Sequence, residues 1–165
     1  MDAPGPAVDT RHLRNALGRF ATGVTIVSCL DAEGRYVGLT ANSFNALSLA
    51  PPLVLWSLRE SSPSLAAFLA APRFAVNVLA EAQVELSRRF ASRREDKFDD
   101  GLWALGEHGA PLLAGCAAVF ECEQVSQQVA GDHRLFIGRV LACTESPVPP
   151  LVFQGGHYHL LGEVL

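Results

Sequence analysis

Short apolar runs separated by turn residues dominate the chain. Those in the first half lie at 23–30, 36–40, 53–58 and 73–80, and further runs fill the last third up to position 161. Runs of this length, rich in Val, Ile, Leu and Phe and bounded by Gly, Pro, Asp or Ser, are typical of β-strands joined by hairpins. Strands outnumber helices by about two to one, so the pattern predicts a mainly antiparallel β-barrel with helices outside it.

Helical periodicity is present in 9–20, 61–72 and 81–93. In the first of these segments, Asp9 or Thr10 can cap a helix whose apolar side chains share one face: Leu13, Leu17 and Phe20. This face should lie on an apolar surface. The second segment begins with serines before Pro63, and in the third Val84, Ser87 and Phe90 or Ala91 share one face. Residues 95–111 are predicted to form an irregular loop anchored by Trp103.

Composition places the chain among folded single domains. Of its 165 residues, 49% are apolar and 18% are charged. We expect one domain over 9–165, preceded by a disordered Pro/Gly/Ala-rich segment at 1–8. A net charge of -4 disfavours nucleic-acid binding, and neither a secretory signal nor an apolar run of about 18 residues is present. The chain is therefore expected to be cytoplasmic, with no membrane association.

The four cysteines, Cys29, Cys116, Cys122 and Cys143, form no CxxC pair and no metal-finger spacing. They are predicted to be small buried side chains in a reducing compartment. His157 and His159 share one face of a predicted strand, but no third ligand accompanies them, so no metal site is predicted. GxGxxG, GxxxxGKS/T, GxSxG and HExxH motifs are also absent.

The segment 38–56 combines polar and apolar features. Four side chains that form hydrogen bonds fall within six positions, namely Thr40, Asn42, Ser43 and Asn45, and Gly38 allows close approach of a ligand to the backbone. Such a segment suits a planar ligand with a polar edge, although a solvated hairpin gives the same pattern. Pro51 and Pro52 end the polar part, and the next strand should begin after them.

Cations concentrate in one segment, which contains Arg88, Arg89, Arg93, Arg94 and Lys97. Guanidinium groups bind phosphate in a bidentate manner, and Ser87 could add a hydroxyl donor. A solvated helix face, with Glu85, Glu95 and Asp96 as partners, is the alternative. Further along, His133 follows a turn at the start of a strand, where its imidazole could face a cleft or remain a surface side chain.

Six motifs together resemble one family. They are FATGVTIV (20–27), GLTANSFNALSLAPPLV (38–54), FAVNVLAEAQVELSRRFA (74–91), DKF (96–98), GAPLLAGCAAVFECE (109–123) and GDHRLFIGRV (131–140). In this order and spacing the chain is similar to the short-chain flavin reductases, the reductase components of two-component flavin monooxygenases. LVFQGGHYH (151–159) is similar to the styrene monooxygenase reductase branch.

This resemblance implies an FMN-binding split barrel, antiparallel and Greek-key-like, that forms a homodimer. It also implies an NAD(P)H:flavin oxidoreductase, which would reduce FMN or FAD with NADH or NADPH and supply the reduced flavin to a partner monooxygenase. A split-barrel protein that binds flavin or haem without turnover is the alternative. The bulky Trp56 could narrow the flavin site, stack on an adenine or fill the core.

The resemblance also implies roles for particular residues. Thr40, Ala41, Asn42 and Ser43 would line the polar edge of the isoalloxazine. Ser57, Leu58, Arg59 and Ser62 would lie along the ribityl phosphate. The phosphate would be held by Ser87, Arg88, Arg89, Phe90 and Ala91 together with Lys97. His133 would lie beside the nicotinamide as the catalytic-site residue.

Overall fold

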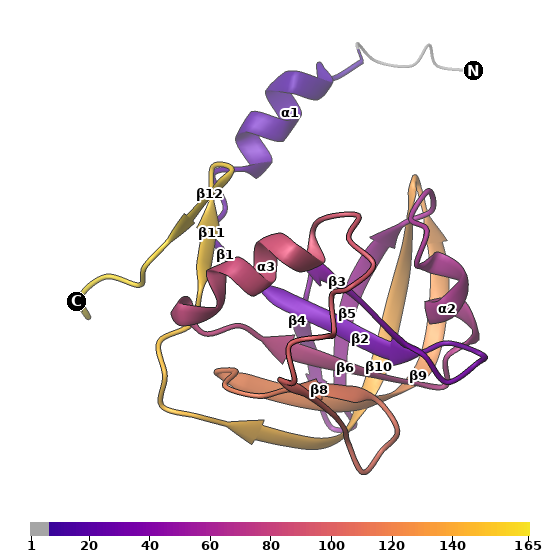
Figure 1. Ribbon diagram of the computed structural model, residues 1–165. Coiled ribbons are helices and arrows are strands. Elements are labelled where there is room, and N and C mark those ends of the chain that lie inside the picture. Colours follow the sequence, from indigo (N-terminus) through magenta and orange to yellow (C-terminus); the bar gives the residue numbers. More distant parts are fainter. Residues whose placement is uncertain (1–6) are drawn as a thin grey trace, which may run out of the picture.

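The apolar runs form one seven-stranded antiparallel sheet in the order β3-β2-β6-β9-β10-β5-β4 (Figure 1). The computed structural model describes residues 7–165. Its strands are β2 (Thr25–Leu30), β3 (Tyr36–Ala41), β4 (Asn45–Leu49), β5 (Pro52–Arg59), β6 (Arg73–Val78), β9 (Ala118–Ala130) and β10 (His133–Glu145). Most of the segment predicted to be disordered, residues 1–6, lies outside the described residues.

The long hairpin of β9 and β10 bends the sheet into a barrel. Its register shifts between Ile137 and Gly138 and again between Val140 and Ala142, and such irregularities increase local twist. The bent hairpin pairs with β6 through β9 and with β5 through β10. At Gly138 a Cβ atom would lie 2.4 Å from the Phe74 ring, so the close approach of the strand to the core requires glycine here.

Aromatic side chains fill the barrel. Trp56 is fully buried, stacks on Phe136 at 4.7 Å between ring centroids and meets the edge of Phe68 at 4.9 Å. Of the alternatives considered for Trp56, the structure shows the core-filling one. Phe68 belongs to α2 (Leu65–Ala70), which covers this part of the barrel.

A second apolar cluster lies between the sheet and α3 (Val84–Phe90), which follows the one-turn 3-10 helix η1 (Glu81–Gln83). Leu86, Ser87 and Phe90 are the buried residues of α3. The predicted helix over 81–93 is thus divided into two parts and ends earlier, at Phe90. The buried positions set which side chains of this helix face solvent.

Residues 95–111 are more regular than predicted, because β7 (Trp103–Leu105) pairs with β8 (Pro111–Leu113) as a hairpin. The predicted anchoring by Trp103 is confirmed: its ring lies 4.8 Å from that of Phe98 and 5.2 Å from that of Phe90. Gly38 faces the same cluster, since a Cβ there would meet Phe98 at 3.0 Å and Phe90 at 3.1 Å. Its lack of a side chain accommodates these rings, whereas the sequence suggested contact with a ligand.

The first helix, α1 (Thr10–Leu17), projects away from the barrel beside a small sheet of β1 (Thr22–Gly23), β11 (Val152–Gln154) and β12 (His157–His159) (Figure 1). Asp9 caps it by accepting from the backbone amides of Arg11 and His12, as predicted. No residue of α1 is buried: Leu17 is 64% exposed and Phe20, which lies beyond the helix, is 77% exposed. The expected apolar surface for this helix is not provided by residues 7–165.

Three cysteines are buried as predicted, and burial raises the pKa of the Cys29, Cys116 and Cys122 thiols to about 12. Cys143 is exposed, so the prediction was wrong for this residue. Across residues 7–165, no helix has the length and apolar character needed to cross a membrane. The same residues contain no cluster of three potential metal ligands among His, Cys, Asp and Glu.

Candidate functional site

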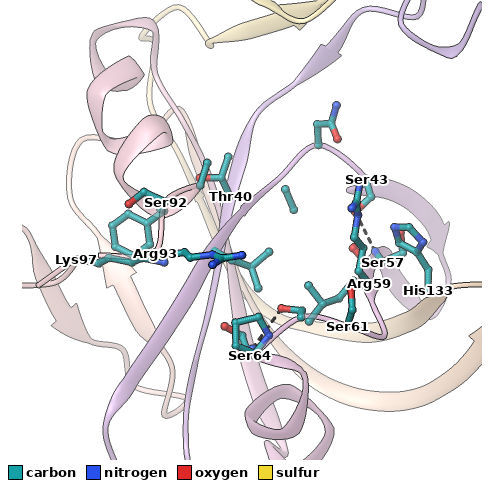
Figure 2. A pocket seen from close by; sticks show the side chains of 18 residues that line it. Thr40, Ser43, Ser57, Arg59, Ser61, Ser64, Ser92, Arg93, Lys97 and His133 are labelled. Atoms are coloured by element: carbon teal, nitrogen blue, oxygen red, sulfur yellow. Dashed lines mark hydrogen bonds between the residues drawn. The ribbon is translucent and has the colours of Figure 1, made fainter. Parts of the chain in front are cut away.

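A cavity of about 610 Å³ lies between the connection from β3 to β4, the segment from the end of β5 into α2, and the segment after α3 (Figure 2). Its volume is within the range of roughly 300–1,000 Å³ that is usual for small-molecule sites. Most of the residues predicted for the site line it: Thr40, Ala41, Asn42, Ser43, Ser57, Leu58, Arg59, Ser62, Phe90, Ala91, Lys97 and His133. Four parts of the chain therefore meet here, because His133 at the start of β10 joins the three segments.

Hydrogen bonds fix the backbone at the rim of the cavity. Thr40 donates through Oγ1 to the carbonyl of Ser87 at 2.6 Å, which ties the end of β3 to α3. The Thr25 hydroxyl donates to the carbonyl of Ala41 at 2.7 Å. These bonds hold Thr40 and Ala41 before a ligand arrives, so the adjacent donors are preorganised.

Ser43 joins the other side of the rim to β5. Its hydroxyl donates to the carbonyl of Ser57 at 3.0 Å and accepts from the amide of Ser57 at 2.9 Å. A side chain here replaces the backbone partner that a neighbouring strand would supply. The connection from β3 to β4 is thereby held against β5, and the cavity keeps its shape on this side.

Two basic side chains reach the cavity from the segment after α3, Arg93 and Lys97. Neither forms an ion pair among the described residues, whose pairs involve other basic groups. The Lys97 ammonium lies 5.9 Å from the Phe90 ring centroid, and burial lowers its pKa. Cations without a carboxylate partner, next to hydroxyl groups, are suited to hold a phosphate.

The predicted residues Ser87, Arg88 and Arg89 do not line this cavity. Ser87 is fully buried and shares a hydrogen bond of 2.7 Å with the Tyr158 hydroxyl. Arg88 forms an ion pair with Glu85 and lies over the Tyr158 ring, and Arg89 is paired with Asp100 at 2.6 Å. Ser87 thus positions the rim through its carbonyl, whereas both arginines are held by acidic partners outside the cavity.

His133 lies at the start of β10, where the register places it opposite Arg59 at the end of β5. In Figure 2 it stands across the cavity from Arg93 and Lys97. Its Nδ1 atom is 2.7 Å from the carboxylate of Asp132, and this hydrogen bond lowers the pKa of Asp132. The side chain is 38% exposed, so one edge of the imidazole is available to a ligand at the mouth.

Sequence patterns left several lining residues unassigned, namely Leu39, Ser61, Pro63, Ser64, Ser92 and Arg93. Of the serines before α2, only Ser62 was predicted to line the site, although Ser61 and Ser64 also face the cavity (Figure 2). Arg93 belonged to the predicted cation cluster and was not singled out. Its position follows from the end of α3 at Phe90, three residues earlier, which the helical period in the sequence did not indicate.

The residues present fit a flavin phosphate. One end of the cavity provides the cations, the rim provides hydroxyl and amide donors, and Leu39, Leu58 and Phe90 provide apolar walls for a ring. No carboxylate lines the cavity among the described residues. The arrangement can therefore bind an anionic ligand with a flat, polar-edged ring and orient a second ring near His133.

Residues 17–162 match the family model of the flavin reductase like domain. The chain is 44% identical to the FMN reductase (NADH) SmoA of Agrobacterium fabrum (strain C58 / ATCC 33970), over 91% of this chain and 85% of that protein. It spans from 48% to 85% of the length of three curated relatives that are 42% to 46% identical to it. Relatives can thus extend well beyond the matched region.

Solved structures agree in fold. The NADH:FAD oxidoreductase SgcE6 of Streptomyces globisporus, in complex with NAD and FAD fragments, has a TM-score of 0.88 at 38% identity, covering 96% of this chain and 98% of that chain. The styrene monooxygenase flavin reductase SMOB from Pseudomonas putida S12 has a TM-score of 0.84 at 38% identity, covering 92% and 98%.

The fold and the matched region define a flavin reductase-like protein. This chain belongs to the flavin reductase-like family, as its motifs predicted. The prediction of a mainly antiparallel split barrel with flanking helices is also confirmed.

Proposed function

We propose that this protein is an NAD(P)H:flavin oxidoreductase that reduces FMN or FAD with NADH or NADPH. The observation that carries the proposal is the cavity, which joins a fixed hydrogen-bonding rim to two cations that have no acidic partner within residues 7–165. The relatives named as an FMN reductase (NADH) and as an NADH:FAD oxidoreductase support the activity and both flavins. They favour it over a binding protein without turnover.

The chain's own residues would bind and orient the reactants. Lys97 and Arg93 would hold the flavin phosphate, and donors of the segment from Thr40 to Ser43 would face the polar edge of the ring. When bound, the flavin accepts a hydride from a reduced nicotinamide. Because negative charge develops at that polar edge during reduction, donors held there in advance favour the reaction without a catalytic acid.

His133 would contact the nicotinamide at the mouth of the cavity. Its hydrogen bond to Asp132 orients the imidazole, and its exposed edge faces the cavity that the flavin would occupy. Placing two rings in contact accounts for much of the rate of such a transfer, because the bimolecular encounter becomes an oriented one. His133 would thus act mainly by positioning the hydride donor.

The reduced flavin would pass to a separate monooxygenase. The similarity to the styrene monooxygenase flavin reductase supports a partner of this class. The site supports release as well, since the cavity opens to solvent at exposed residues such as Asn42, Arg59 and Ala91. A flavin held at such a site can dissociate after reduction.

A homodimer is the assembly that we propose. The apolar face of α1 and the outer side of β4 are unburied, with Leu17 64% and Leu49 95% exposed. Burial of such side chains against a second copy would remove a large apolar surface from water. In light scattering, Leu17→Glu should shift the measured mass toward that of the monomer. The control Leu105→Glu, at an exposed leucine of β7, should leave the mass unchanged. A dimer that persists in both variants would contradict the proposal that α1 forms the dimer contact.

A cytoplasmic location is also proposed. The four cysteines are free thiols in the structure, and exported proteins of this size more often use theirs in disulfides. Fractionation of cells that produce the protein tests this, since recovery outside the cytoplasm would contradict it.

Steady-state kinetics test the activity. Purified protein should oxidise NADH or NADPH only when FMN, FAD or riboflavin is added, and the rate should saturate with the flavin. A protein that only binds flavin would change the flavin spectrum and leave the nicotinamide unoxidised. Flavin binding without oxidation of either nicotinamide would therefore establish the alternative function.

A further inference from the structure

A second hollow of about 440 Å³ lies directly beyond the candidate flavin cavity, between the turn that joins β2 to β3 and helix α2. Pro63 and Ser64 line both spaces. Leu39 lines the first space and Val37 lines the second, and these residues lie on the same face of β3 because they are two positions apart. The two spaces therefore follow one another along β3.

The floor of the second hollow is apolar and carries only small side chains. It is formed by small or short side chains, which are Val37, Pro63, Ala66, Ala67 and Ala70. No bulky side chain from α2 rises into the space, so a flat ring could lie on this surface. Beside this apolar floor, the hollow has a wall in common with the cavity and a polar rim.

The rim of the hollow is a fixed group of charges from the turn. Asp31 accepts from the backbone amides of Glu33 and Arg35, both at 2.9 Å, and from the Arg35 Nε atom at 2.8 Å. Arg35 also donates to Glu33 at 3.2 Å. The guanidinium is thereby held in place although the side chain is 74% exposed, and a planar guanidinium can stack on an aromatic ring.

The segment between the two spaces can accommodate phosphates. Ser61, Ser62 and Ser64 line the first cavity, and Figure 2 shows Ser64 between the side that carries Arg93 and the side that carries Arg59. FMN would end at its phosphate near these residues. A dinucleotide would continue past Pro63 and Ser64, and the next space along β3 is the second hollow.

We propose that this hollow binds the adenosine of a dinucleotide whose phosphates lie beside Ser64. The purine would lie on the alanine floor with Arg35 at its face, and the Glu33 carboxylate would accept from ribose hydroxyls. The proposal rests on the function proposed above. FAD and NAD(P)H both carry an adenosine joined to two phosphates, and the experiment below distinguishes these two ligands.

The test fills the hollow without touching the flavin cavity. Ala66 lines the hollow from the exposed side of α2, so Ala66→Trp would place an indole on the floor. Ala82→Trp is the matched control, because Ala82 is an exposed residue of η1 outside both spaces. Calorimetric Kd values for FAD and FMN, and the KM for NADH with FMN as acceptor, are measured for both variants.

If FAD supplies the adenosine, Ala66→Trp should raise the Kd of FAD by about tenfold and leave that of FMN within about twofold. If the nicotinamide dinucleotide supplies it, the KM for NADH should rise by a similar factor while the FAD to FMN ratio is unchanged. Ala82→Trp should change neither value. Equal values for both variants would overturn the proposal.

A further variant covers the case in which Ala66→Trp does not fold. Arg35→Ala lies on the exposed turn and should weaken the same dinucleotide without affecting FMN. ADP binding to the protein without flavin provides a readout independent of reductase activity: it should weaken in Arg35→Ala and remain in Ala82→Trp. Absence of FMN binding in the wild type would instead refute the proposed function, whereas absence of ADP binding alongside normal FMN binding would refute only the adenosine site.

Discussion

Replacing Lys97 with Gln removes a cation from one end of the cavity while keeping a polar side chain of similar reach. Lys97 is half-buried and has no ion-pair partner among the described residues, so its charge is available to a ligand phosphate. A hydrogen bond to a charged group contributes about 1.5–3 kcal/mol. Since Lys97 is partly exposed, solvent screening favours the lower value, and the Kd of FMN should rise roughly tenfold.

Arg88→Gln is the matched control. Arg88 lies nine positions earlier, is paired with Glu85 on the outer face of α3 and does not line the cavity. Exposed pairs of this kind contribute less than about 1 kcal/mol, and this contribution concerns folding, so the Kd of FMN should stay within about twofold. The two variants make the same change of charge, which separates a local contact from a general effect of net charge.

Fluorescence titration with FMN and with riboflavin is the assay. Riboflavin lacks the phosphate, so Lys97→Gln should leave its Kd within about twofold. An equal loss of affinity for FMN and for riboflavin would show that Lys97 supports the fold of the cavity and does not contact the phosphate. A larger increase in the Kd of FMN for Arg88→Gln than for Lys97→Gln would indicate that the phosphate binds at α3, and it would refute the proposed role of Lys97.

Three further outcomes are expected. Burial lowers the pKa of Lys97 below its ordinary value of 10.5, and a bound phosphate would favour the charged form. The preference for FMN over riboflavin should therefore fall as pH rises through that lowered pKa. A preference that stays constant up to pH 10.5 would contradict this. Gly38→Ala should lower the unfolding free energy by about 1–3 kcal/mol, because the new Cβ would lie 3.0 Å from Phe98. In the control Gly23→Ala, no atom lies within 4 Å of the new Cβ, so denaturant titrations should show no loss of stability from crowding. His133→Ala should raise the KM for NADH roughly tenfold and change the Kd of FMN by less than about twofold, and collapse of flavin binding would show that its role is misassigned.

The strands were predictable because their apolar runs are as long as typical β-strands. The polar segment before Pro51 was harder to interpret, because β4 lies at an edge of the sheet and four of its five residues are exposed without alternation: Asn45, Ala46, Leu47 and Leu49. The pattern of one buried and one exposed face, on which strand prediction depends, is absent there. The β7 and β8 hairpin was missed for a related reason, since each strand has three residues.

The site was predictable as a set of segments and less so as individual side chains. The motif from Thr40 to Ser43 does line the cavity, and so does His133. The direction of each cation depends on where α3 ends: Arg88 and Arg89 leave from the outer face of the helix, and the chain turns after Phe90 so that Arg93 reaches the cavity. A helix boundary shifted by three residues is within the ordinary error of sequence patterns, and here it changes which arginine can meet a phosphate.

Anaerobic reduction of flavin is the most direct test of the central claim, that the cavity brings a flavin and a reduced nicotinamide together. With NADH or NADPH in excess and oxygen removed, small amounts of the protein should bleach the visible absorbance of FMN, FAD or riboflavin far faster than the nicotinamide does alone, and Lys97→Gln should slow the reaction at low FMN but not at low riboflavin. A folded protein that binds flavin and accelerates bleaching with neither nicotinamide would contradict the account.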